Sequence, residues 1–186
     1  MKGYDFISTL VKEKVFINNH LNLFDIFIKN YFGNKEVVGV EIGVLIASHA
    51  NCLLHHMPSV KKLFLVDPYI CYDKYNRSGL DVAFVLARKK LECYDGRKEF
   101  VTKKFQDAVG DIPDNLDFVY YDIFDDEDRI QSFLDLYYSK VRVGGVIGGW
   151  NFDAEHNGVA RVVIPFADDM GLELEGVGSS WWFVKE

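Results

Sequence analysis

The sequence lacks the marks of several protein classes. Its three cysteines, Cys52, Cys71 and Cys93, form no CxxC pair and no cysteine–histidine spacing of a zinc site, so neither a disulfide framework nor structural zinc is expected. No apolar run approaches the ~18 residues of a membrane span. The first residues carry no unbroken apolar segment and no small-residue cleavage signal. We therefore expect a soluble, cytoplasmic protein that does not associate with a membrane.

An excess of positive charge is also absent. The chain has 21 basic and 28 acidic residues, which give a net charge of −7. Nucleic acids and anionic membranes both require a basic surface, so neither is expected as a partner. The 186 residues suit one domain, 1–186, that is large enough for its own core. No repeat, low-complexity tract or linker marks an internal boundary.

Helical spacing characterises the first 35 residues, whereas strands and helices alternate over residues 37–186. Residues 1–35 are predicted to form N-terminal helices, a candidate lid, with Gly33 as the stop of the last one. Pro165 is expected to kink or divide the last long helix, because proline lacks the N–H donor. The predicted strands are residues 37–44, 62–69, 99–105, 115–122, 141–149, 172–177 and 180–186.

Alternating strands and helices predict an α/β fold with a parallel sheet covered on both faces. The last two strands have no helix between them, so one of them must run antiparallel to its partner. Such a sheet binds its ligand at the carboxyl ends of its strands. The candidate site residues are therefore those that end the strands: Glu41 to Gly43, Asp67, Gln106, Asp107, Asp122, and Trp150 to Asp153.

The turn after the first strand combines Glu41 with Gly43. A glycine there lets a ligand approach the main chain, and the following helix terminus offers free N–H groups. An acid two residues earlier would repel a pyrophosphate and attract an ammonium group. Leu45 also stands where the dinucleotide fingerprint requires its second glycine. A cationic amino-acid cofactor fits this turn better than NAD, and a tight turn with a surface acid is the alternative.

Two more strand ends carry polar groups. Asp67 ends the second predicted strand, where an acid can accept hydrogen bonds from both hydroxyls of a ribose, although an Asp-Pro pair can also be only a turn. Gln106 and Asp107 follow the third strand and could contact an adenine edge. A helix N-cap explains these two residues equally well.

Four motifs stand in an order that resembles one known family: Glu41-Ile-Gly43, Leu65-Val-Asp67-Pro68, Asp117-Phe-Val-Tyr-Tyr-Asp122 and Val141-Arg-Val-Gly144-Gly145. Together they resemble the class I S-adenosylmethionine-dependent methyltransferases, and most closely their compact branch of sugar and macrolide O-methyltransferases. The resemblance covers roughly residues 37–186, including the terminal SSWWFVK.

The resemblance implies a Rossmann-like three-layer sandwich. Its seven-stranded sheet would have the order 3-2-1-4-5-7-6, with the seventh strand antiparallel. The implied cofactor is S-adenosylmethionine, with Glu41 and Gly43 at the methionine moiety, Asp67 at the ribose, and Gln106 and Asp107 at the adenine. Ala47 would supply the small residue needed where the helix packs on the strand.

The sequence departs from this branch after the fourth and fifth strands. The branch commonly has Asp-Gly-Asp-His and then His-Asp or Asp-Asp, whereas this chain has Asp122-Ile123-Phe124-Asp125 and Trp150-Asn151. Asp122 and Asn151 are candidate ligands for a divalent cation that is weakly bound or absent. The acidic run 125–128 is better explained by the helix macrodipole than by metal binding.

Candidate catalytic groups are Asp122, which could also contact the cofactor, Asp153 and His156. His156 follows the fifth strand and could act as a general base near neutral pH, or it could be a surface histidine. We expect an S-adenosylmethionine-dependent methyltransferase that acts on a hydroxyl of a small metabolite or sugar. A catalytically inactive cofactor-binding or scaffold protein of the same fold is the alternative, and a nicotinamide oxidoreductase is disfavoured by Glu41.

Overall fold

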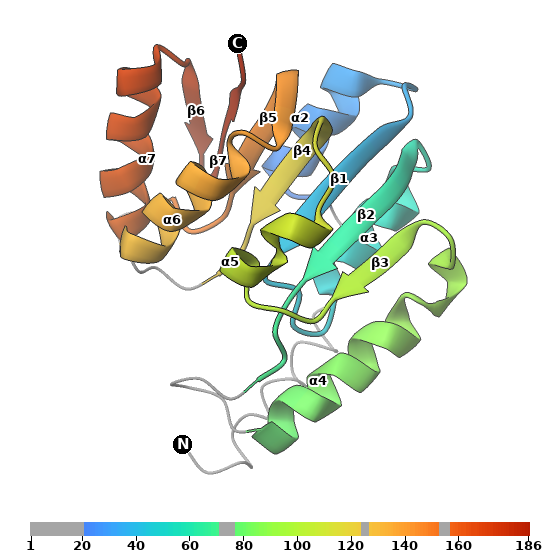
Figure 1. Cartoon of the computed structure of the whole chain (residues 1–186). Coiled ribbons are helices and arrows are strands. Elements are labelled where there is room, and N and C mark those ends of the chain that lie inside the picture. Colours follow the sequence, from blue (N-terminus) through green and yellow to red (C-terminus); the bar gives the residue numbers. More distant parts are fainter. Residues whose placement is uncertain (1–20, 71–76, 124–126, 153–156) are drawn as a thin grey trace.

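The computed structural model describes residues 21–70, 77–123, 127–152 and 157–186 (Figure 1). Its strands are β1 (Val37–Ile42), β2 (Val60–Val66), β3 (Lys98–Val101), β4 (Leu116–Tyr121), β5 (Val141–Gly149), β6 (Leu174–Val177) and β7 (Ser180–Val184). Its α-helices are α2 (Leu23–Phe32), α3 (Ser48–His56), α4 (Arg77–Lys90), α5 (Phe105–Ala108), α6 (Glu127–Tyr137) and α7 (Asn157–Met170). Short 3₁₀ turns follow α4 and α5 at Glu92–Tyr94 and Val109–Asp111.

The strands form one seven-stranded sheet in the order β3-β2-β1-β4-β5-β7-β6. The pairs from β3 across to β5 are all parallel, whereas β7 runs antiparallel to both β5 and β6. The predicted order and the antiparallel seventh strand are therefore confirmed.

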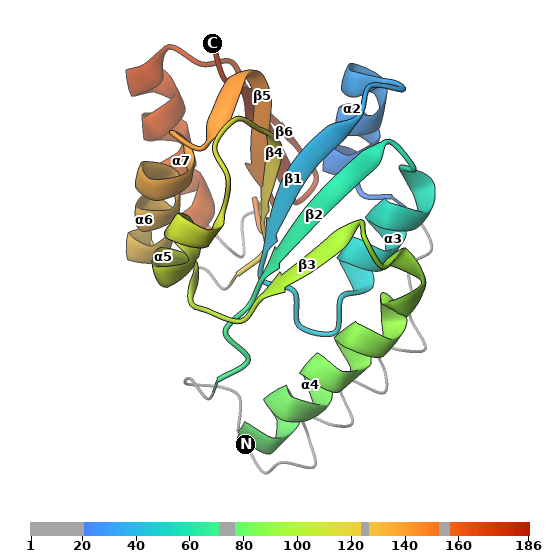
Figure 2. The ribbon, with the colours of Figure 1, turned by 45° about the vertical axis from the view of Figure 1, so that its right-hand side comes forward.

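Helices cover both faces of the sheet, as the edge-on view in Figure 2 shows. The helices α2, α3 and α4 lie on one face, and α5, α6 and α7 lie on the other. Successive strand residues point to opposite faces, so each strand serves two cores. In β4, Phe118 and Tyr120 pack in the first core while Val119 and Tyr121 pack in the second. The result is the three-layer sandwich that the sequence predicts.

Helix α2 begins and ends where its local sequence dictates. Asn22 is the N-cap, and it forms a capping box with Asp25, in which each side chain accepts a hydrogen bond from the other residue's main chain. Gly33 follows the last turn with φ of 58°, a conformation that glycine adopts without strain. Gly33 is thus confirmed as the stop, and the predicted N-terminal helices before residue 21 lie outside the described residues.

Several strand boundaries and the last long helix differ from the prediction. Helix α7 is not divided at Pro165, which lies inside it between the buried Val163 and Ala167, and the expected kink there stays a prediction. Strand β3 ends at Val101, since Phe105 is buried in the second core and already begins α5. None of the described helices is long and apolar enough to span a membrane.

Candidate cofactor-binding site

One cavity of about 540 Å³ lies at the carboxyl ends of the central strands. It is bordered by the ends of β1, β2 and β4 and by the first residues of α3. The fold brings six of the predicted site residues to its walls: Glu41, Gly43, Asp67, Gln106, Asp122 and Asn151.

In the turn between β1 and α3, two residues that are not glycine adopt the left-handed conformation that glycine usually adopts. Leu45 has φ of 46° and Ala47 has φ of 56°, both in the left-handed region that side chains rarely adopt. Ala47 is fully buried and forms the N-cap of α3. A residue with a larger side chain would not fit there, so the predicted need for a small residue is met.

Gly43 is required for a reason that the sequence does not reveal. Its φ is 90°, and a Cβ at this position would lie 2.1 Å from the main-chain oxygen of Asp122. The space that a side chain would occupy is therefore filled by the end of β4 and not by a ligand. Gly43 therefore has a packing role between two strand ends, and because it also lines the cavity, its expected role of admitting a ligand to the main chain stays a prediction.

Asp67 holds the same turn from the end of β2. Its Oδ2 accepts hydrogen bonds from the N–H groups of Val44 and Leu45, at 3.0 and 2.9 Å, and its Oδ1 accepts one from Tyr69 at 2.9 Å. An ionised carboxylate has about four acceptor sites, so roughly one is left for a ligand. Asp67 can thus receive one ribose hydroxyl more easily than the two that we expected.

Asp67 and Tyr69 together form a clamp on this turn. Tyr69 is not among the site residues that the sequence predicts. Its hydroxyl donates a hydrogen bond of 2.9 Å to the carbonyl of Leu45. Burial, followed by the nearby charge of Asp67, raises the pKa of Tyr69 far above its usual value, so the hydroxyl remains a donor. The aromatic residue two positions after the aspartate of an Asp-Pro turn was the available signal.

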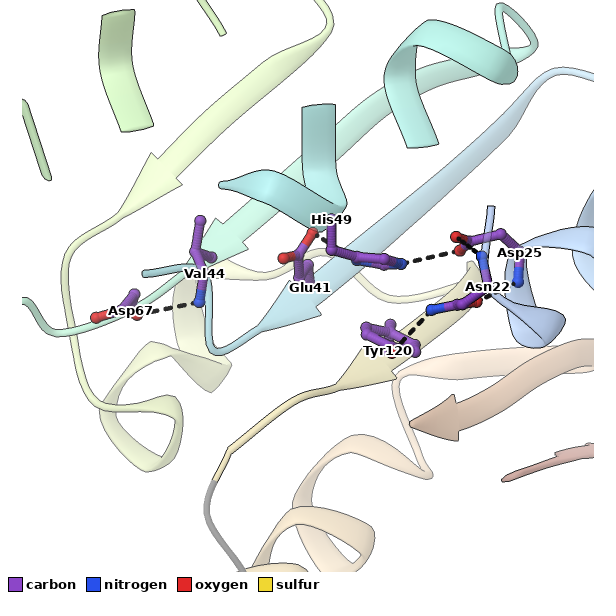
Figure 3. Close-up of polar contacts among 7 residues, drawn as sticks. All are labelled: Asn22, Asp25, Glu41, Val44, His49, Asp67 and Tyr120. Atoms are coloured by element: carbon purple, nitrogen blue, oxygen red, sulfur yellow. Dashed lines mark hydrogen bonds and ion pairs between the residues drawn. The ribbon is translucent and has the colours of Figure 1, made fainter. Parts of the chain in front are cut away.

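Glu41 lies next to the end of β1, almost fully buried, and contacts His49 of α3 (Figure 3). Its Oε2 lies 3.1 Å from His49 Nδ1, while His49 Nε2 lies 2.9 Å from Oδ1 of Asp25 in α2. Burial raises the pKa of the Glu41 carboxyl, and the charge of His49 partly offsets this. Burial would lower the pKa of His49, but the charges of Asp25 and Glu41 outweigh it and hold the pKa well above its usual value.

The ring of His49 stacks on Tyr120 of β4, with ring centroids 4.1 Å apart. The Tyr120 hydroxyl accepts a hydrogen bond of 2.9 Å from the side-chain amide of Asn22. Asn22 and Asp25 thus connect the start of α2 to the wall of the cavity. Sequence reasoning missed both residues, although the Asn-x-x-Asp spacing is that of a capping box.

The residues after β3 do not form the helix N-cap that was one of the two expectations. Gln106 and Asp107 lie within α5, whose N-cap is Lys104, so the N-cap assignment is wrong. Gln106 lines the cavity together with Lys104 and Phe105, whereas Asp107 is not among the lining residues. The adenine contact of Gln106 stays a prediction.

Asp122 and Asn151 follow β4 and β5 and line the same cavity. Main-chain hydrogen bonds from Asp122 to Ile42 and from Trp150 to Tyr121 hold these strand ends together. Among the described residues, no three histidine, cysteine or acidic side chains are grouped so that they could hold a metal ion. The candidates Asp153 and His156, and residues 125 and 126 of the acidic run, lie outside the described residues.

The structure is similar to solved methyltransferases. An O-methyltransferase from Bacillus cereus in complex with S-adenosylhomocysteine (SAH) is 16% identical, with a TM-score of 0.65 over 100% of this chain and 92% of that one. A putative caffeoyl-CoA O-methyltransferase from Staphylococcus aureus is 11% identical, with a TM-score of 0.68 over 96% and 91%. The O-methyltransferase NovP is 20% identical, with a TM-score of 0.61 over 85% and 74%.

The chain has the methyltransferase fold. No family model matches the sequence, and no curated protein matches it. The likeness is therefore one of structure, and it agrees with the predicted Rossmann-like sheet. In this methyltransferase fold, the cavity occupies the carboxyl ends of the strands, where open α/β sheets bind their ligands.

Proposed function

We propose that this chain is an S-adenosylmethionine-dependent methyltransferase that acts on a hydroxyl group of a small metabolite or sugar. The observation that carries this proposal is the meeting of Glu41 and Asp67 at one cavity in a methyltransferase fold. The SAH bound to some structural neighbours and the O-methyltransferase names of others support the same cofactor and the same acceptor group.

The residues at the cavity fit this cofactor. A volume of about 540 Å³ is within the range of small-molecule sites, which is about 300–1,000 Å³. The buried carboxylate of Glu41 suits an ammonium group, the remaining acceptor capacity of Asp67 suits a ribose hydroxyl, and the amide of Gln106 suits an adenine edge. Glu41 disfavours the pyrophosphate of NAD, as the sequence indicates, whereas an acid such as Asp67 suits the ribose of either cofactor.

When bound, the cofactor supplies an electrophilic methyl group on a sulfonium sulfur. The chain itself must align the acceptor oxygen and receive its proton. Asp122 is exposed at the end of β4 and lines the cavity, so its carboxylate can accept the hydroxyl proton or orient the hydroxyl. Asn151, at the end of the adjacent β5, can donate a hydrogen bond to the acceptor. No step of this mechanism requires a metal ion.

A cofactor-binding protein without catalysis is the second candidate. It is favoured by the sequence after β4 and β5, where Phe124 and Trp150 replace polar residues of the branch that the sequence resembles. Such a protein would bind the cofactor through Glu41 and Asp67 and would have no use for Asp122.

Methyl transfer to a panel of sugars, phenols and hydroxylated metabolites distinguishes the two. We expect turnover by the wild type that survives a chelator and falls at least about 100-fold in Asp122→Asn, the usual scale for a general base. Asp128→Asn, an exposed acid in the first turn of α6, is the matched control and should retain activity. Binding of SAH without turnover on any acceptor, or full loss of turnover in chelator, would contradict the proposed enzyme.

A further inference from the structure

The contact between Asp25, His49 and Glu41 is a buried charge cluster that spans three elements (Figure 3). Asp25 is 0% exposed and Glu41 is 1% exposed, while the His49 side chain is 15% exposed. A neutral imidazole has one N–H, so it could donate to only one of its two carboxylate neighbours. Facing a carboxylate on each ring nitrogen, His49 is an imidazolium.

The cluster holds two carboxylates against one imidazolium, so it carries an excess of one negative charge. An uncompensated charge is costly in a buried site. Asp67 adds another negative charge near Glu41. The thiol of Cys52 lies close enough to interact electrostatically with both Asp25 and His49. The excess negative charge therefore lies at the cavity wall, at Glu41, and favours the binding of a cation there.

Glu41 retains room for that cation. Its Oε2 is buried, and among the described residues no donor is aligned with it, because the N–H of His49 does not point straight at the oxygen. In Figure 3 the other carboxylate oxygen of Glu41 is turned away from His49. A primary ammonium group has three N–H donors and can satisfy such a carboxylate from the cavity side.

We propose that Asp25 and His49 are positioning residues of the cofactor site, which act through Glu41 and make recognition of the cofactor's ammonium group depend on helix α2. This inference rests on the proposed function. Asp25 holds His49 charged, and His49 opposes the rise that burial causes in the pKa of Glu41 and fixes the Glu41 side chain near the end of β1. Neither Asp25 nor His49 needs to touch the cofactor for its loss to weaken binding.

The test compares SAH with methylthioadenosine, which keeps the adenosine and the thioether but has no amino-acid end. We expect His49→Gln and Asp25→Asn to weaken SAH about 10- to 100-fold, the scale of a charge-assisted hydrogen bond, and to leave methylthioadenosine within about threefold. Decarboxylated SAH, which keeps the amine, should lose affinity as SAH does. If the two variants bind SAH more weakly but bind decarboxylated SAH as the wild type does, the cluster acts on the carboxylate of the ligand and not on its amine, and the assignment is wrong.

Asn22→Ala is the matched control for a purely structural effect. It removes the side-chain cap of α2 and the hydrogen bond to Tyr120 but leaves the three charges in place. We expect a lower melting temperature with an unchanged ratio of the two dissociation constants. Equal losses for SAH and methylthioadenosine in His49→Gln and Asp25→Asn would show that the cluster only supports the fold. A wild type that binds neither ligand would instead contradict the proposed function itself.

Discussion

Asp67 at the end of β2 accepts a hydrogen bond of 2.9 Å from the main-chain N–H of Leu45 in the turn after β1. The carboxylate that we expected to serve a ligand, or to form only a turn, therefore also holds the neighbouring turn that borders the cavity. Leu45 adopts a left-handed conformation that costs a side-chain-bearing residue roughly 1–2 kcal/mol. The clamp from Asp67 and Tyr69 supplies the interactions that keep the turn in this conformation.

Replacement of Asp67 should therefore affect both stability and binding. We expect Asp67→Ala to lower the free energy of unfolding by on the order of 3 kcal/mol, because three main-chain N–H groups lose a carboxylate acceptor. We also expect it to weaken SAH binding by about 1.5–3 kcal/mol, because a ribose hydroxyl loses the same acceptor. Denaturant unfolding and calorimetry measure the two effects. Tyr69→Phe, which removes one neutral hydrogen bond to the same turn, should cost only about 0.5–1.5 kcal/mol. Unchanged stability in Asp67→Ala would contradict the clamp.

Gly43 should be intolerant of any side chain. We expect Gly43→Ala to destabilise the fold by about 3–5 kcal/mol, because the new Cβ combines a left-handed φ with a collision against the main chain of Asp122. Gly178, with φ of 61° and no heavy atom within 4 Å of the place that a Cβ would take, is the matched control. Gly178→Ala should cost only about 1–2 kcal/mol in the same unfolding experiment. Equal losses of stability at the two positions would show that backbone strain alone causes the loss and that the collision with Asp122 adds nothing.

Ala47 should accept glycine, unlike its neighbour Ala50. Both are fully buried, but Ala47 is left-handed at the N-cap while Ala50 lies in the first turn of α3. Ala47→Gly loses a methyl group and gains relief of strain, so we expect a change within about 0.5 kcal/mol. Ala50→Gly should cost about 1–2 kcal/mol, since it loses the methyl group and helix propensity. A larger loss at Ala47 than at Ala50 would mean that the turn is not strained.

The pair of Asp25 and His49 should make stability depend on pH. Because the folded pKa of His49 is raised, its protonation contributes stability that is complete below the usual value of 6.5 and is lost as pH rises through the folded pKa. Asp25→Asn removes the largest cause that raises this pKa. The destabilisation caused by Asp25→Asn should thus be greater near pH 6.5 than above the folded pKa of His49. Urea unfolding across this window measures it, and a pH-independent difference would argue against a charged His49.

The sheet could be predicted from the sequence because each strand carries its own signal. Residues 141–149 are rich in valine and isoleucine and are predicted as a strand despite their glycines, and β5 occupies the same residues. The order of the seven strands is what the resemblance to the class I methyltransferases implies, and the sheet has that order. The predicted third strand extends too far, since Phe105 fits a strand pattern and becomes buried only when α5 packs on the second core.

The charge cluster could not be predicted, because its members are far apart in the sequence. Asp25 follows the buried Phe24 within an amphipathic helix, and a single acid in such a helix is typical of a surface residue. His49 fits a helix-packing position equally well. Only the docking of α2 over β4, β5 and β7, which brings Asp25 against α3, shows that Asp25, His49 and Glu41 meet, and that a carboxylate of the cofactor turn already has a charged partner.

Calorimetric titration of the wild-type chain with SAH, S-adenosylmethionine and NAD tests the central claim most directly. The cavity that joins Glu41 to Asp67 should give saturable binding of one molecule of SAH or S-adenosylmethionine per chain and no binding of NAD. Binding should be lost in a folded Glu41→Ala variant, since the ammonium group then has no buried carboxylate to meet. Binding of NAD, or SAH affinity that is unchanged without Glu41, would contradict the account.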